Sequence, residues 1–245
     1  MSVIERLRAG LIVSVQAEPG SVLDDPATIA LLARCVVANG AAAVRVAGAE
    51  TIRAVRAAVN VPIVGLIKGE ASGFWPYITS SLADVAAICA AGADIVAFDA
   101  TLRPRASGVT VAELCDAAQR SGRLAFADCA TVDDGHAALS VGADIVATTL
   151  AGYTTETAGC RLPALDLVRA LAKLHPFVVC EGGIAEPDQA RAAFVAGASA
   201  VVVGTAISNM DALTRRFAAA VASAFVSFVS SVVIQRRYRE PRMRL

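Results

Sequence analysis

Hydrophobic residues recur along the chain in short, nearly continuous runs, each followed by a polar turn and a stretch with helical periodicity. This pattern repeats eight times. Because the runs are apolar throughout and do not alternate, they predict parallel strands that are buried on both faces. The predicted strands are residues 10–15, 42–46, 62–67, 94–98, 124–127, 144–147, 177–180 and 200–203. Helical patterns lie between them, for example at residues 28–38, 49–59, 81–91 and 111–121.

Related phrases near the ends of four helices support a regular architecture: VANGAAAVRV, AAGADIVAFD, SVGADIVATT and VAGASAVVVG. Their glycines, Gly40, Gly92, Gly142 and Gly197, are separated by 52, 50 and 55 residues. Each interval holds two strand–helix units, and each glycine suits the end of a helix. The pattern predicts an α/β fold, a (βα)8 TIM barrel over residues 1–222 that begins with a short helix. Residues 223–245 are expected to form a helical extension with a basic tail.

Composition narrows the class of protein. The 245 residues are 56% hydrophobic, which suits one α/β barrel, and 22 basic residues balance 22 acidic ones, so no nucleic-acid partner is expected. Six cysteines without a C-x-x-C pair predict reduced thiols in a cytoplasmic protein. The start, MSVIERLRAG, lacks the apolar segment of a secretory signal.

Polar residues close most of the predicted strands. They are Gln16, Arg45, Lys68, Asp99, Asp128, Thr148 with Thr149, and Glu181, whereas strand eight ends at Gly204. Barrel active sites lie at the carboxyl ends of the strands, and buried charges are costly without partners. A rim of structural salt bridges would explain any one of these residues. The set favours a pocket for a small polar ligand.

Two glycine turns point to an anion site. Gly182-Gly183 follows the seventh strand and Gly204-Thr205 follows the eighth. Glycine lets the backbone approach a ligand closely, and backbone N–H groups at such turns bind phosphate in many barrels. Ordinary strand–helix turns are the alternative interpretation.

Lys68 and Glu181 are the candidate acid/base groups. The chain contains only two lysines, Lys68 and Lys173, and Lys68 closes an apolar strand. Desolvation lowers a lysine pKa and makes the free amine a competent base, whereas a neighbouring carboxylate raises it. A lysine and a glutamate beside a phosphate pocket suit proton abstraction next to a carbonyl group. A Schiff-base lysine is the competing interpretation.

Several phrases resemble those of the N-acetylmannosamine-6-phosphate 2-epimerase family, over residues 10–221. They are LIVSVQAEPGSVL, AAVRVAG, VPIVGLIK, YITSSLADV, GADIVAFDAT, FADCAT, GADIVATTLAGYT, VVCEGGI and AVVVGTAIS. The resemblance implies a barrel of the ribulose-phosphate-binding type. It also implies an isomerase that interconverts N-acetylmannosamine 6-phosphate and N-acetylglucosamine 6-phosphate at C2 in sialic acid and amino-sugar catabolism, with no metal and no organic cofactor.

The same resemblance implies roles for particular residues. Lys68 would remove and return the C2 proton, and Glu181 would assist ring opening and hold the developing enediolate. The implied sugar contacts are Gln16, Arg45, Asp128, Tyr153 and Thr148, and the implied phosphate contacts are Gly182, Gly183, Gly204 and Thr205.

Three positions depart from the family pattern. Many members carry basic residues where this chain has Gly69 and Gly183, and an Arg where it has Asn209. Backbone donors, with Arg45 or Arg103 adding positive charge, are expected to hold the phosphate instead.

Other enzyme classes on this fold fit less well. A pentulose-phosphate 3-epimerase needs metal-binding histidines at strand ends, whereas His136 and His175 are expected in a helix and at the amino-terminal end of a strand. The chain lacks the pyrophosphate–magnesium pattern of a thiamine-phosphate synthase. A non-catalytic phosphosugar-binding protein would not need both Lys68 and Glu181.

The C-terminal segment is unusual. Residues 217–234 carry no charge, and QRRYREPRMRL follows them. A membrane helix is one interpretation, weakened by four serines. The favoured interpretation is a final barrel helix ending near Ala222, followed by a segment that packs against a second subunit of a homodimer.

Overall fold

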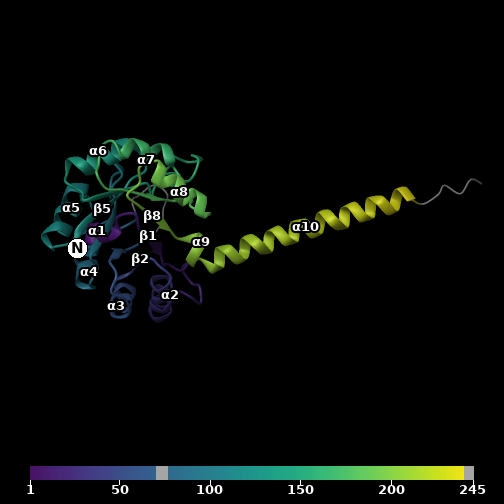
Figure 1. Ribbon diagram of the computed structural model, residues 1–245, viewed down its shortest axis with the longest axis horizontal. Helices are drawn as coiled ribbons and strands as arrows, with labels where there is room; N and C mark the ends of the chain where they lie inside the picture. Colours follow the sequence, from purple (N-terminus) through teal and green to yellow (C-terminus); the bar gives the residue numbers. More distant parts are fainter. Residues whose placement is uncertain (70–76, 240–245) are drawn as a thin grey trace, which may run out of the picture.

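The computed structural model describes residues 1–69 and 77–239, with side chains as far as residue 224. Within these residues eight parallel strands form a closed barrel in the order β1 to β8, surrounded by helices (Figure 1). The strands are β1 (Leu11–Ser14), β2 (Ala43–Ala47), β3 (Ile63–Leu66), β4 (Ile95–Asp99), β5 (Leu124–Asp128), β6 (Ile145–Ala147), β7 (Val178–Glu181) and β8 (Ala200–Val203). The predicted (βα)8 barrel is confirmed, and each strand lies within two residues of its expected bounds.

Helices alternate with these strands. They are α1 (Val3–Leu7), α2 (Pro26–Ala38), α3 (Ala49–Ala58), α4 (Leu82–Ala90), α5 (Val111–Arg120), α6 (Val132–Ser140), α7 (Leu165–Leu171), α8 (Pro187–Val195), α9 (Thr205–Ser208) and α10 (Met210–Arg239). Reciprocal hydrogen bonds between an N-cap hydroxyl and an acidic residue three positions later start α4, α5 and α6. The four repeated glycines all have positive φ, from 82° to 105°, as helix-ending glycines require.

Two layers of apolar side chains form the core. The inner layer fills the barrel and includes Ile12, Phe126 and Phe177, while the outer layer packs the helices against the strands. Leu7 of α1 is fully buried in the inner layer, and the Ala9 N–H donates to Ser199 just before β8. The short first helix therefore closes the amino-terminal end of the barrel and leaves the opposite end open for a ligand.

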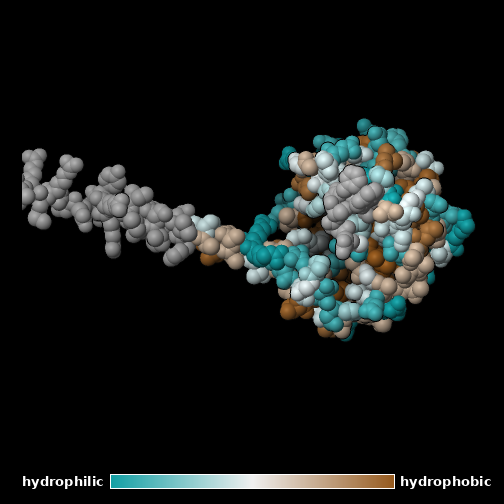
Figure 2. Space-filling model, turned by 180° about the vertical axis from the view of Figure 1, so that it is seen from behind, coloured by the Kyte–Doolittle hydropathy of each residue, from teal (hydrophilic) through white to brown (hydrophobic). Residues whose placement is uncertain are grey.

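The last helix differs from the expectation of a barrel helix that ends near Ala222. A single turn, α9, follows β8, and α10 then continues for 30 residues and stands away from the barrel (Figure 1). Its described apolar residues are open to solvent, with Phe217 and Val221 each 69% exposed (Figure 2). The helix runs through residue 222 without a break, so the division of the chain at that point stays a prediction.

Among the residues that the structure describes, no helix is both long and apolar enough to cross a membrane. Trp75, which follows the third strand in the sequence, and residues 240–245 of the basic tail lie outside the described residues.

Candidate functional site

A pocket of about 540 Å³ occupies the carboxyl end of the barrel. Nine of the eleven predicted site residues line it: Gln16, Arg45, Lys68, Tyr153, Glu181, Gly182, Gly183, Gly204 and Thr205. Asp128 and Thr148, both fully buried, are not among its lining residues and lie behind that wall. Sequence reasoning did not assign Ser14, Glu18, Ser208 or Arg216, which also line the pocket.

Arg45 forms the charged floor of the pocket. Strands β2 and β5 bring it to Asp128, with Nη1 3.1 Å from Oδ1 and Nη2 2.7 Å from Oδ2. Arg45 Nη1 also lies 3.2 Å from Glu181 Oε2, and the guanidinium stacks over Phe126 at 5.1 Å from the ring centre. Asp128 and Glu181 thus occupy this guanidinium, so Arg45 is poorly suited to the phosphate role suggested for it.

Two adjacent threonines after β6 hold Glu181. The Thr148 hydroxyl accepts from the Glu181 N–H at 3.1 Å and donates to the Glu181 carbonyl at 2.8 Å, which fixes the backbone. The Thr149 hydroxyl instead faces the pocket, 2.5 Å from Asp128 Oδ1 and 3.1 Å from Glu181 Oε2. Thr148 therefore positions the glutamate, and Thr149 contacts its carboxyl group.

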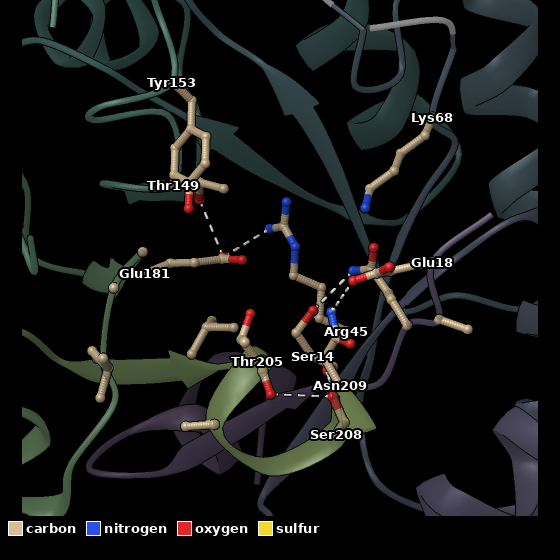
Figure 3. A pocket seen from close by; sticks show the side chains of 18 of the residues that line it. Ser14, Glu18, Arg45, Lys68, Thr149, Tyr153, Glu181, Thr205, Ser208 and Asn209 are labelled. Carbon is tan, nitrogen blue, oxygen red and sulfur yellow. Dashed lines mark hydrogen bonds and ion pairs between the residues drawn. The ribbon is translucent and has the colours of Figure 1, made fainter. Parts of the chain in front are cut away.

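Lys68 approaches from the other side of the pocket, where it points toward Arg45 and Glu181 (Figure 3). It lies two residues beyond β3 and is held by a short antiparallel bridge to Ile78. The Gly69 N–H donates to the Tyr77 carbonyl at 2.7 Å, and the Thr79 N–H donates to the Ile67 carbonyl at 2.7 Å. These bonds set the backbone on both sides of the lysine, so its amine reaches the pocket centre.

The surroundings move the pKa values of these two groups in opposite directions. Burial lowers the pKa of Lys68, the nearby Arg45 lowers it further, and Glu181 opposes both effects. Burial raises the pKa of Glu181 to about 7, and Asp128 adds to this, although Arg45 acts against it. Burial thus favours the uncharged amine of Lys68 and the uncharged carboxyl group of Glu181 over their ionised forms.

The glycine turns flank the opposite end of the pocket from Lys68. Gly182 and Gly183 adopt φ of 100° and 74°, which side chains rarely tolerate. A Cβ on Gly183 would lie 2.4 Å from Leu162 Cβ, so this backbone has no room for the basic residue common in the family. A Cβ on Gly204 would lie 3.3 Å from Ser14 Cβ. Because neither glycine carries a Cβ, the backbone of both turns can be approached closely by a ligand.

Arg216 and Gln16 add polar groups that fit a phosphosugar. Arg216, from α10, lines the pocket as Thr205 does, and no ion pair to it is found among residues 1–69 and 77–224. Gln16 Nε2 donates to Ser14 Oγ at 2.9 Å, while Gln16 Oε1 is buried and lacks a partner in the described structure. A ligand N–H group could satisfy this oxygen.

Arg103 lies elsewhere. It binds Asp99 Oδ2 at 2.7 Å and lines a second hollow with Thr131, Asp133 and Glu156. The suggestion that Arg103 adds charge at the phosphate end is therefore wrong, because its charge is paired and its side chain belongs to another site.

His175 lies in the turn before β7, at the amino-terminal end of the barrel, where its ring contacts the Ala143 and Phe177 carbonyls at 3.0 and 3.1 Å. Over the described residues, no three His, Cys, Asp or Glu side chains are grouped to hold a metal ion.

Comparison with known proteins decides the family. The profile described as "Putative N-acetylmannosamine-6-phosphate epimerase" (NanE) matches residues 29–223. The chain belongs to this family. The resemblance predicted from the sequence phrases is therefore confirmed.

Curated relatives align with most of the length of this chain. It is 44% identical over 220 residues to the "Putative N-acetylmannosamine-6-phosphate 2-epimerase" of Cutibacterium acnes, covering 88% of this chain and 95% of that protein. The "Bifunctional enzyme NanE/NanK" of Brucella melitensis is 44% identical over 222 residues, which are 91% of this chain but only 42% of that protein. The chain therefore spans less than half of the bifunctional relatives.

Solved structures agree. The N-acetylmannosamine-6-phosphate 2-epimerase from Clostridium perfringens superposes with a TM-score of 0.85 at 33% identity, covering 89% of this chain and 96% of that one. Thiamine phosphate pyrophosphorylase from Pyrococcus furiosus, at 15% identity and a TM-score of 0.57, shares the fold alone.

Proposed function

We propose that this chain interconverts N-acetylmannosamine 6-phosphate and N-acetylglucosamine 6-phosphate by moving the proton at C2. Membership of the epimerase family supports the substrate. The main support for proton transfer is that Lys68 and Glu181 face each other across one pocket (Figure 3). The glycine turns line the same pocket. This arrangement holds a phosphate at one end and an acid/base pair at the other.

The phosphate anchors the substrate. Gly183, Gly204 and Arg216 all line the pocket, and in this proposal backbone N–H groups of the glycine turns and the Arg216 guanidinium bind the phosphate. Binding energy from the phosphate then holds C2 near Lys68 without taking part in the reaction itself.

Lys68 acts as the base. Because burial and Arg45 lower its pKa, a larger fraction of the amine is unprotonated at neutral pH than for an exposed lysine. The open-chain sugar places its C2 proton next to a carbonyl group, which makes that proton acidic. Lys68 removes the proton and returns it, and inversion at C2 requires that the planar intermediate first turn its opposite face to the lysine.

Glu181 exchanges protons with the oxygen atoms of the sugar. With a pKa of about 7 it is available as both acid and base near neutrality, so it can assist ring opening and stabilise the enediolate. Asp128 and Thr148 act from behind the wall by fixing Arg45 and the Glu181 backbone.

Gln16 and Tyr153 recognise the sugar. The unpaired Gln16 Oε1 suits the N–H of the acetamido group, and Tyr153, 56% exposed, lines the pocket beside Glu181. An analogue that lacks the N–H would leave this oxygen unsatisfied and should bind less well.

Turnover of N-acetylmannosamine 6-phosphate in D₂O, followed at C2 by proton NMR, tests the function. The protein should exchange the C2 proton with solvent during epimerisation. Lys68→Ala should lose about 10²–10⁴ in kcat, and Lys68→Arg should be almost as poor because guanidinium stays protonated. Glu181→Gln should be slow but retain some exchange on open-chain sugar. Near-normal exchange by Lys68→Ala would identify another base, with Glu181 the first candidate.

The assembly we infer is a homodimer in the cytoplasm. The six cysteines are free thiols, three of them buried, which suits a reducing compartment.

An isolated helix gains little stability in water, and α10 leaves Phe217 and Val221 exposed, so a second copy is the partner that fits it best.

A further inference from the structure

One hydroxyl group stands between two carboxyl groups in the pocket wall. Thr149 Oγ1 lies 2.5 Å from Asp128 Oδ1 and 3.1 Å from Glu181 Oε2. A threonine hydroxyl carries a single proton and can donate to only one of these oxygens. Once Asp128 receives that proton, the Thr149 oxygen requires another donor for its contact with Glu181 Oε2, which Arg45 Nη1 also approaches at 3.2 Å, and a proton on Glu181 meets that requirement.

The charges around the cluster lead to the same requirement. Arg45 is the shared cation, and its side chain and that of Asp128 are 2% and 0% exposed, with Glu181 at 14%. One guanidinium faces two carboxyl groups, which leaves a buried excess of negative charge if both are ionised. Lys68, Tyr77 and Tyr153 line the same pocket as Glu181, and a neutral Lys68 would not offset that excess.

We propose that Thr149 is a positioning residue that donates its proton to Asp128 and accepts a proton from Glu181, so that Glu181 begins each turnover as the acid form. The shorter of the two Thr149 contacts is the one to Asp128, which Arg45 keeps ionised through two further hydrogen bonds. The longer contact is then a Glu181 O–H donating to the Thr149 oxygen.

This assignment gives the reaction a defined proton balance, and it rests on the proposed function. Lys68 takes the C2 proton as the C–H bond breaks, and the electron pair forms the C1=C2 bond. The carbonyl oxygen at C1 takes the proton that leaves Glu181. Lys68 is then an ammonium and Glu181 a carboxylate, and the reverse step on the other face restores both. No oxidant or further reactant is consumed.

Titration of Glu181 in the ligand-free protein tests the role of Thr149 without turnover. Carbon-13 NMR of labelled glutamate carboxyl groups, with the Glu181 signal assigned by its loss in Glu181→Gln, reports the protonation directly. Thr149→Val removes the acceptor of the Glu181 proton and should lower the Glu181 pKa by about one unit, because the acid form loses its hydrogen bond. Thr149→Ser keeps the hydroxyl and should leave the titration unchanged.

The opposite sign overturns the proposal. If Thr149 simply donates to an ionised Glu181, Thr149→Val removes a bond to the charged form, and the pKa rises. An unchanged pKa also refutes the role. Should the valine variant fail to fold, Thr149→Ala measured in the same way carries the same prediction.

The pH profile of kcat/KM provides the second readout. The part of the profile that is set by the Glu181 pKa should shift to lower pH in Thr149→Val and should match wild type in Thr149→Ser. A purely structural defect would instead lower kcat/KM equally at every pH. A wild-type protein that titrates as proposed but does not epimerise the phosphosugar would contradict the proposed function and leave the role of Thr149 supported.

Discussion

Replacing Arg216 should weaken binding of the phosphate more than it slows the chemistry. Arg216 lines the same pocket as Thr205 and Gly204, while Arg45 is already bound by Asp128 and Glu181. A hydrogen bond between charged groups contributes about 1.5–3 kcal/mol when shielded from water. The Arg216 side chain is exposed, so solvent screening reduces this to about 1 kcal/mol. We therefore expect Arg216→Ala to raise KM about fivefold.

The ratio of kcat to KM separates this role from a catalytic one. The phosphate is bound equally in the ground and transition states, so kcat should change less than about twofold. Inorganic phosphate should also inhibit Arg216→Ala more weakly than wild type, which reports on the phosphate end without any sugar. Arg216→Lys keeps the charge and should recover part of the loss.

Arg53→Ala is the matched control. Arg53 is exposed on α3, is absent from the pocket lining, and carries the same charge. A long-range effect of net charge would raise KM in both variants to a similar extent, and a KM of Arg216→Ala equal to wild type would place the phosphate away from α10. Either result would refute the assignment of Arg216.

Three further predictions address the glycine turn, the assembly and the buried carboxyl group. Gly204→Leu should raise KM steeply in steady-state assays with the fold retained by circular dichroism, because a side chain there presses on Ser14 and enters the pocket; an unchanged KM would place the phosphate elsewhere. Truncation after Ala222 should give a smaller species in light scattering, whereas a monomeric full-length protein that binds lipid vesicles would contradict the dimer. Since the folded pKa of Glu181 is raised from 4.5 to about 7, the folded state binds more protons in that window and stability falls as pH rises through it. The free energy of unfolding of Glu181→Gln should therefore exceed that of wild type by up to about 3 kcal/mol above pH 7. If the difference in unfolding free energy between the two proteins does not change with pH, the pKa of Glu181 is not raised.

The fold follows from local patterns that survive into the tertiary structure. Parallel strands buried on both faces must be apolar throughout, and a helix that turns back to a strand needs a residue with positive φ, which Gly40 and Gly197 supply. Lys68 and Glu181 were predictable for a related reason, because the carboxyl end of every barrel strand opens on the same pocket.

The rest of the site depends on side-chain direction and on contacts between distant segments. Thr148 and Thr149 are neighbours, yet one binds the Glu181 backbone and the other faces the pocket, because successive residues point to opposite sides. Arg216 reaches the pocket from α10, and local sequence patterns do not specify how that helix joins the barrel. Glu18 fixes that junction by accepting from Asn209 at 3.2 Å and from Arg215 at 2.5 Å, contacts that span nearly 200 residues.

Arg45 explains why the phosphate needs its own cation. The guanidinium lowers the pKa of Lys68 and partly offsets the raised pKa of Glu181, so it acts on both reacting groups at once. It can do so only while Asp128 and Glu181 hold it in the floor of the pocket, and that neutralised position makes it a poor partner for a phosphate. The turn at Gly183 has no space for a basic side chain, and Asn209 is bound to Glu18. Positive charge at the phosphate end must therefore come from another segment, and among the described residues that line the pocket Arg216 is the cation left to provide it.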